Sequence, residues 1–196
     1  MRTLCFGGSF NPIHHAHLIC ARSAAETSGF DRVLLIPTSQ PPHKPNSATL
    51  AAPTDRLAMT RLAVEGDPFF AVDDIELTRC GPSYTFDTVR FLTEREGRPV
   101  HWLIGADMLM YLPKWHRGQE LIHMVNFLVM ARPGWSLDWE KLPPEFRKLR
   151  EHVIEVPQIA ISATQIRERV AAGLPINYLT PPAVCKYIAD KKLYRS

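Results

Sequence analysis

The sequence predicts an α/β fold in which helices cover both faces of a parallel β-sheet. Short apolar runs rich in branched residues alternate with longer amphipathic stretches along most of the chain. A short apolar run is typical of a strand buried on both faces, and strand–helix alternation favours parallel pairing. The predicted arrangement is therefore a doubly wound, Rossmann-like sheet, which binds ligands at the carboxyl ends of its strands.

Five apolar runs are predicted as the buried strands. They lie at residues 4–6, 33–36, 100–104, 127–130 and 153–156. The loops after Phe6, Ile36 and Ile104 are expected to hold the functional site, because each leaves the carboxyl end of a predicted strand.

Amphipathic stretches are predicted as the helices that accompany these strands. They lie at residues 16–28, 54–65, 84–96, 163–172 and 182–191. Gly29 and Gly173 follow two of them, where glycine readily adopts the left-handed conformation that ends a helix. The 196 residues suit one domain, 1–196, with a small helical part at about 160–196.

Composition narrows the class of protein. Hydrophobic residues make up 45% and charged residues 22%, as in ordinary soluble globular proteins. The net charge of +3 comes without a clustered basic stripe, so no nucleic-acid partner is expected. No signal peptide and no apolar run of about 18 residues is present, so we expect a cytoplasmic protein with no membrane partner. None of the four cysteines forms a CxxC pair, which argues against a zinc site or a redox dithiol.

The loop after the first predicted strand, residues 7–18, carries the strongest chemical signal. Gly7 and Gly8 allow a sharp turn and the close approach of a phosphate. The next helix is expected to begin near His14 and to direct its free N–H groups and positive dipole end at the same place. His14 and His17 are three residues apart and share one face of the first turn. The loop therefore predicts a polyphosphate site, although an isolated histidine here would more simply be a surface residue.

A second anion-binding helix start is predicted at residues 161–167. Ser162 is a good N-cap, and Thr164 adds a hydroxyl beside the free amides of the first turn. Arg167, one turn further, can return to the same anion with two hydrogen bonds. Taken alone, this segment could equally be a capped helix with a solvated arginine. Its value comes from its pairing with the histidine loop.

These two motifs resemble the HxGH and ISSTxIR motifs of the adenylyltransferase superfamily. The closer resemblance, over nearly the whole chain, is to the bacterial nicotinate-nucleotide adenylyltransferases. Further stretches that resemble this family in the same order are residues 41–44, 76–79, 81–88, 104–107, 112–117 and 178–194. Two positions depart from the pattern: Ala16 replaces a glycine, and Ala163 replaces a second serine.

The resemblance implies transfer of the adenylyl group of ATP to nicotinate mononucleotide, giving deamido-NAD and pyrophosphate in NAD biosynthesis. The attacking phosphate is already ionised, so no general base is needed and catalysis depends on positioning and charge stabilisation. His14, His17 and Arg167 are the expected catalytic residues. No carboxylate cluster would hold a metal from the protein alone, so Mg²⁺ is expected to arrive with ATP.

The resemblance also implies binding residues for each substrate. Those for ATP are Gly7, Gly8, Ser9, Phe10, His14, His17, Gly105, Asp107, Ser162, Thr164 and Arg167. Those for nicotinate mononucleotide are Lys44, Tyr84, Thr85 and Trp115. Trp115, in a polar loop, would stack on the pyridine ring, whereas Trp102 lies inside a predicted strand and should be core. A solvated loop position for Lys44 and an N-cap role for Asp107 stay as alternatives.

Three rival functions use the same fold. The first is a sister enzyme that takes another acceptor, such as pantetheine phosphate or nicotinamide mononucleotide. The second is an RNA-charging or RNA-binding protein, against which the short chain and dispersed charge argue. The third is a nucleotide sensor without activity, against which the intact His14, His17 and Arg167 argue. The sequence leaves open whether a homo-oligomer forms, and whether residues 135–150 are a surface excursion or a subunit contact.

Overall fold

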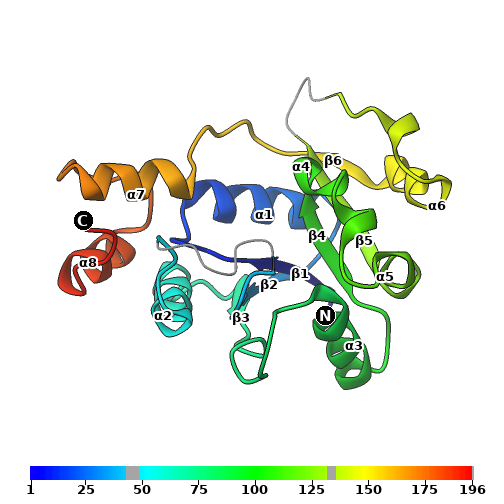
Figure 1. The fold of residues 1–196 in the computed structure, drawn as a ribbon, viewed down its shortest axis with the longest axis horizontal. Coiled ribbons are helices and arrows are strands. Elements are labelled where there is room, and N and C mark those ends of the chain that lie inside the picture. Colours follow the sequence, from blue (N-terminus) through cyan, green and yellow to red (C-terminus); the bar gives the residue numbers. More distant parts are fainter. Residues whose placement is uncertain (43–48, 132–135, 196) are drawn as a thin grey trace.

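The computed structural model describes residues 1–42, 49–131 and 136–195, and the strands it describes form one parallel sheet (Figure 1). The order across the sheet is β3-β2-β1-β4-β5-β6. The strands are β1 (Thr3–Gly8), β2 (Arg32–Pro37), β3 (Phe70–Val72), β4 (His101–Gly105), β5 (Asn126–Ala131) and β6 (Val153–Glu155). The chain reaches one edge at β3 and crosses back to place β4 beside β1. The order therefore reverses between β1 and β4, where a doubly wound sheet opens its ligand crevice.

Helices lie on both sides of this sheet (Figure 1). They are α1 (His15–Thr27), α2 (Pro53–Ala63), α3 (Thr85–Glu96), α4 (Ala106–Leu109), α5 (Gly118–Met124), α6 (Pro144–Arg147), α7 (Ala163–Ala171) and α8 (Pro182–Asp190). Three 3-10 segments join them, η1 (Leu112–Lys114), η2 (Trp139–Lys141) and η3 (Lys148–His152). The doubly wound fold and the predicted helices are confirmed, whereas β3, α4, α5 and α6 were not predicted.

Each inner strand is apolar along its length because both of its faces are buried. Successive side chains of a strand point to opposite faces. In β2, Val33 and Leu35 pack with α1, α2, α7 and α8, whereas Leu34 and Ile36 pack with α3, α4, α5 and α6. The sheet thus separates two apolar layers, and continuous apolar runs rather than alternating ones are the expected sequence pattern.

Glycines end two of the predicted helices as expected. Gly29 follows α1 with φ of +67°, and Gly173 follows α7 with φ of +68°. Both values lie in the left-handed region that glycine enters without a steric cost. Among the described residues, no helix is long and apolar enough to cross a membrane.

Residues 136–152 contribute three buried apolar side chains to the core, and the rest of this segment is exposed or half-buried. This stretch forms η2, α6 and η3, and it buries Leu142, Phe146 and Leu149 in the layer that contains α3 and α5. The Phe146 side chain is fully buried. The charged residues of the segment lie between these apolar anchors, which explains why its sequence pattern was ambiguous.

Candidate active site

The loop between β1 and α1 makes its turn after the two glycines. Gly7 and Gly8 both belong to β1, and the reversal falls on Phe10, with φ of 42°, and on the cis bond between Asn11 and Pro12. A Cβ on Gly7 would lie 2.6 Å from the Trp102 ring, and one on Gly8 would lie 2.9 Å from the Phe10 ring. The expectation that the glycines form the turn was wrong, because close packing of aromatic rings is what excludes a side chain there.

The two histidines of the loop lie against each other at the start of α1. His14 is the N-cap of α1, and its backbone N–H donates a hydrogen bond of 3.3 Å to His17 Nδ1. The two imidazole rings are stacked, with centroids 3.6 Å apart and an interplanar angle of 20°. The Phe10 ring meets His17 edge-on at 5.2 Å. The sequence-based expectation that His14 and His17 share one face of the first turn is thus met in the structure.

Both imidazoles are neutral at neutral pH. Burial, with a smaller contribution from His15, lowers the pKa of His14 from 6.5 to about 4. Burial and the neighbouring His14 lower the pKa of His17 well below its usual value. Because Nδ1 of His17 accepts the hydrogen bond from His14, the proton of the neutral ring resides on Nε2. His17 can therefore donate from Nε2 to a ligand oxygen.

Helix α7 brings the second predicted motif to the same loop. Its N-cap is Ser162, whose side chain accepts a 3.2 Å hydrogen bond from the Gln165 N–H. Arg167 Nη1 donates to the carbonyl of Asn11 at 2.8 Å, and its Nη2 donates to the Thr164 hydroxyl at 3.2 Å. Arg167 therefore contacts the loop after β1 directly, although 156 residues separate it from Asn11.

The Phe10 side chain belongs to the core. It is 2% exposed and packs against Phe6, at 5.6 Å between ring centroids. Any contact of Phe10 with ATP is accordingly one of its main chain.

The end of β4 lies beside β1, across the point where the strand order reverses. Gly105 is the N-cap of α4, and the exposed Asp107 carboxylate folds back against it. A Cβ on Gly105 would clash with Asp107 Oδ1, so glycine is required for this carboxylate position. The N-cap alternative for Asp107 was wrong, because Gly105 is the N-cap of α4 and Asp107 lies in the first turn without a side-chain cap hydrogen bond. The exposed carboxylate oxygens are accessible to hydroxyl groups.

The residues expected to bind the acceptor gather at the start of α3. Tyr84 is the N-cap and Thr85 the first residue of this helix. The Tyr84 ring stacks on His116, with centroids 4.2 Å apart, which places the loop of Trp115 against the same helix start. The Tyr84 N–H donates to the Pro82 carbonyl at 3.0 Å, so the amides available to a ligand begin with Thr85. Lys44 lies outside the described residues.

Sequence reasoning missed several buried polar residues around the site. Asn11 donates to the Thr49 carbonyl at 2.9 Å and accepts from the Ala51 N–H at 3.0 Å and the Tyr194 hydroxyl at 2.8 Å. Arg56, in α2, is fully buried. In the sequence, Arg56 is indistinguishable from the solvated arginines of an amphipathic helix, whereas Asn11 at least lies inside the first motif.

The donor set of the site does not suit a resident metal ion. In the part of the chain that the structure describes, no group of three or more His, Cys, Asp or Glu side chains is placed to hold one. The site offers neutral imidazoles, a guanidinium and helix amides, which recognise oxyanions.

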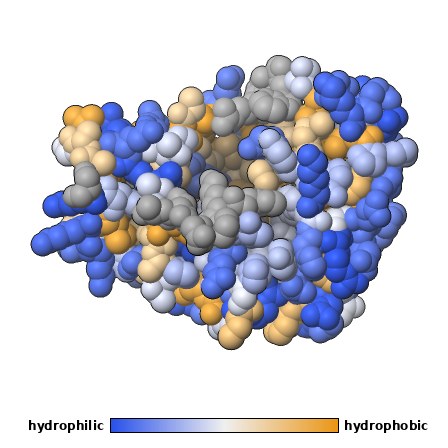
Figure 2. Space-filling model, viewed as in Figure 1, coloured by the Kyte–Doolittle hydropathy of each residue, from blue (hydrophilic) through white to orange (hydrophobic). Residues whose placement is uncertain are grey.

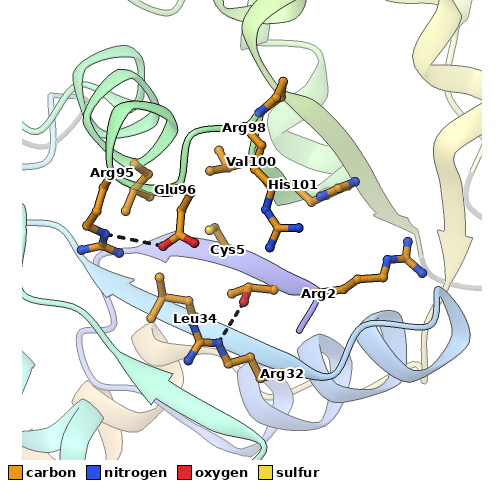
Figure 3. Close-up of a pocket in the computed structure, with 12 residues that line it drawn as sticks. Arg2, Cys5, Arg32, Leu34, Arg95, Glu96, Arg98, Val100 and His101 are labelled. Carbon is orange, nitrogen blue, oxygen red and sulfur yellow. Dashed lines mark hydrogen bonds and ion pairs between the residues drawn. The ribbon is translucent and has the colours of Figure 1, made fainter.

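A separate pocket lies at the opposite, amino-terminal edge of the sheet (Figure 3). It is a cavity of about 40 Å³ beside the buried Cys5, and its basic lining residues are Arg2, Arg32, Arg95, Arg98 and His101. Arg95 lies in the last turn of α3, and Arg2 donates to the carbonyl of Gly29 just after α1. Cations at these positions complement the negative ends of helix dipoles. The helix ends thus account for Arg2 and Arg95, whereas Arg32 donates to the Thr3 hydroxyl and Arg98 to the Met1 carbonyl.

The histidine loop lies where the strand order reverses, and the hydrogen bond from Arg167 to Asn11 brings the start of α7 to the same loop as the two stacked imidazoles. This arrangement defines a nucleotide-binding α/β protein that handles phosphate groups. Polar side chains cover most of the face shown in Figure 2, and apolar ones are scattered over it, as on an ordinary protein surface.

Comparison with known proteins identifies the family. The model of the cytidylyltransferase-like family matches residues 5–169. A probable nicotinate-nucleotide adenylyltransferase of Herpetosiphon aurantiacus is 42% identical over 96% of both chains. Another, of Geobacillus thermodenitrificans, is 44% identical over 96% of this chain and 84% of its own. The chain therefore belongs to the cytidylyltransferase-like family and, within it, to the nicotinate-nucleotide adenylyltransferases.

Solved structures agree on the fold. The nicotinic acid mononucleotide adenylyltransferase of Plasmodium falciparum, complexed with NaAD, superposes with a TM-score of 0.77. It is 19% identical and covers 99% of this chain and 98% of its own. A putative nicotinate-nucleotide adenylyltransferase of Vibrio parahaemolyticus gives a TM-score of 0.66 at 20% identity and covers 100% of this chain and 97% of its own. The predicted α/β architecture and the predicted enzyme family are both confirmed.

Proposed function

We propose that this chain transfers the adenylyl group of ATP to nicotinate mononucleotide and releases pyrophosphate. The observation that carries the proposal is the 2.8 Å hydrogen bond from Arg167 Nη1 to the carbonyl of Asn11. It joins the loop before α1 to the start of α7, so that the N-termini of both helices lie close to the same loop. A reaction between two phosphates requires such a meeting of anion-binding groups, because the reactants repel each other.

In the proposed reaction, an oxygen of the acceptor 5′-phosphate attacks the α-phosphorus of ATP. The bond from that phosphorus to the β-bridging oxygen breaks, and pyrophosphate leaves with the electron pair. The attacking phosphate is ionised at neutral pH, so no proton has to be removed. His17 Nε2–H, His14 and the Arg167 guanidinium stabilise the charge that develops on the transferring and leaving oxygens.

The ATP side of the proposed site comprises the two anion-binding helix starts and the end of β4. Its members are Gly7, Gly8, Ser9, Phe10, His14, His17, Gly105, Asp107, Ser162, Thr164 and Arg167, with Phe10 acting through its main chain. The Asp107 carboxylate would accept hydrogen bonds from ribose hydroxyls. ATP would enter as its Mg²⁺ complex, and Mg²⁺ would neutralise phosphate charge without protein ligands.

The acceptor side comprises the start of α3 and the loop after η1. Trp115 would stack on the pyridine ring and Lys44 would meet the mononucleotide phosphate. The amide of Thr85, at the positive end of α3, would receive the ring carboxylate. A helix N-terminus favours an anion over a neutral amide group, and this supports nicotinate over nicotinamide as the preferred ring.

The proposed enzyme works in a reducing compartment such as the cytoplasm. Cys5, Cys80 and Cys185 form no disulfide, and Cys5 is buried in the core. Free thiols persist where glutathione and thioredoxin keep cysteines reduced.

Incubation of the purified chain with Mg-ATP and a panel of acceptors tests the proposal. The panel contains nicotinate mononucleotide, nicotinamide mononucleotide and pantetheine phosphate, and pyrophosphate release is measured for each. We expect the highest kcat/KM with nicotinate mononucleotide, and deamido-NAD as the product by mass spectrometry. Activity with pantetheine phosphate alone, or with no acceptor, would overturn the proposal.

A further inference from the structure

Arg56 is a fully buried cation that no proposed substrate contact uses. Its guanidinium donates hydrogen bonds to four backbone carbonyls and to no carboxylate among the described residues. The acceptors are Ala51 O at 3.0 Å, Ser9 O at 2.8 Å, Thr38 O at 2.6 Å and Ser39 O at 2.8 Å. These carbonyls belong to three segments: the loop after β1, the loop after β2 and the residues before α2. One planar group thus joins the loops that leave the carboxyl ends of the neighbouring strands β1 and β2.

The burial of this charge has to be offset by its hydrogen bonds. A cation without water or a carboxylate partner is costly in a protein interior. An apolar side chain of similar size would avoid that cost, but it would leave four buried carbonyls without donors. The arrangement therefore depends on the forked geometry of arginine, which reaches several acceptors in fixed directions.

The loop after β2 is held from a second side by Ser83. The Ser83 hydroxyl accepts from the N–H groups of Ser39 and Gln40, at 2.9 and 3.2 Å, and the Ser83 N–H donates to Gln40 O at 2.9 Å. The N–H of Thr38 donates to Gly8 O at 2.9 Å. Together with the two Arg56 bonds, these contacts engage every backbone polar group of residues 38–40.

We propose that Arg56 is a positioning residue for the adenylyl transfer, because it fixes the loop after β1 relative to the loop after β2. The inference rests on the proposed function: the first loop holds the phosphates of ATP, and the second leads into the acceptor side. Each substrate would still bind to its own loop if the hydrogen bonds of the Arg56 guanidinium were lost. The two phosphates would then be misaligned, and a displacement of about 1 Å can reduce turnover by about 10²-fold.

Two variants, Arg56→Lys and Arg56→Met, distinguish the effect of the guanidinium hydrogen bonds from the effect of the positive charge. Lysine retains the positive charge but presents a single donor group, whereas methionine removes both features. We expect kcat to fall by roughly 10- to 100-fold in both variants at saturating Mg-ATP and nicotinate mononucleotide. The dissociation constant of each substrate, measured separately by calorimetry, should change by less than about threefold. Arg61→Met in the same helix is the matched control, because Arg61 is exposed and, among the described residues, forms an ion pair with Asp74 alone.

Ser83→Ala tests the same loop if the Arg56 variants do not fold. It removes the side-chain acceptor of Ser39 and Gln40 while leaving Arg56 intact. We expect a lower kcat here too, and because kcat is measured at saturation, a change in acceptor affinity does not contribute. Thermal unfolding of every variant shows which of them are folded at the assay temperature.

The outcomes are distinguishable. Wild-type turnover in Arg56→Lys would show that charge alone suffices and would overturn the inference. Raised dissociation constants with unchanged kcat would also overturn it, because Arg56 would then act on binding. If the Arg56 variants are unfolded, wild-type turnover in Ser83→Ala counts against the inference. An inactive wild-type chain would instead refute the proposed function.

Discussion

The imidazole of His17 is oriented by the backbone of His14. The N–H of His14 donates to His17 Nδ1 at 3.3 Å, and the two rings stack with centroids 3.6 Å apart. This contact fixes the neutral tautomer that carries its proton on Nε2, since a ring nitrogen that accepts a hydrogen bond has no proton to donate. In the proposed reaction His17 therefore donates a hydrogen bond from Nε2 and is not expected to act as a base.

Replacement of His17 by alanine should mainly reduce turnover. Loss of one donor to a developing oxyanion lowers kcat by about 10²–10³-fold. Steady-state kinetics at saturating substrates measure this effect. His15→Ala is the control, since the backbone N–H of His15 donates to Leu179 O at 3.1 Å and alanine retains this hydrogen bond. A His17→Ala enzyme with normal turnover would remove His17 from the catalytic residues.

The lowered pKa of His14 makes the stability of the protein depend on pH. In the unfolded chain His14 takes up a proton as the pH falls through 6.5, whereas in the folded chain it does so only near 4. Between these values the unfolded state binds more protons, so the free energy of unfolding decreases as the pH is lowered. By about pH 4, the titration of His14 has lowered the free energy of unfolding by about 3 kcal/mol relative to neutral pH.

Urea unfolding of the wild type and of His14→Asn, followed between about pH 7 and pH 4.5, isolates this contribution. Asparagine is a good N-cap, so it retains the helix start while removing the titrating group. The wild type should lose more stability than the variant over this interval. Parallel curves for the two proteins would show that His14 titrates normally in the folded state.

Trp115→Ala should weaken binding of the mononucleotide and leave ATP binding nearly unchanged. Stacking of a base on an aromatic ring contributes about 1–3 kcal/mol, which corresponds to roughly a 10- to 100-fold higher dissociation constant. Calorimetric titration with each substrate measures this effect separately. Trp139→Ala serves as the control, because Trp139 is a partly buried tryptophan of η2 that no proposed ligand contacts. A loss of ATP affinity alone would show that the pyridine ring has been misplaced.

Gly7→Ala should destabilise the fold by way of Trp102. The added Cβ would lie 2.6 Å from Trp102 Cζ2, and overpacking of this kind costs about 1–3 kcal/mol. In a chain of this size, Tm should fall by about 2–4 °C for each kcal/mol. The same substitution in a Trp102→Phe background should cost less, because the smaller ring leaves room. Equal costs in the two backgrounds would contradict the packing explanation.

The sequence determined the parts of this protein that depend on local pattern. Apolar runs predicted the inner strands, and Gly29, Gly173 and Ser162 predicted helix ends, because burial on both faces and helix capping are properties of neighbouring residues. The two motifs predicted the loop before α1 and the start of α7 as the site. The family resemblance predicted the enzyme.

Only the tertiary structure decided how distant segments meet. Arg56 carries no sequence signal, because its role depends on carbonyls that three separate segments bring together. Glycine is required at position 7 because the Trp102 ring of another strand occupies the space of a side chain. The carbonyl that Arg167 binds belongs to a residue 156 positions away in the sequence. The short elements β3, α4, α5 and α6 have too few residues to show a period. The sequence alone thus predicted the groups that are proposed to carry the chemistry, whereas their relative placement follows from packing between segments that are distant in the sequence.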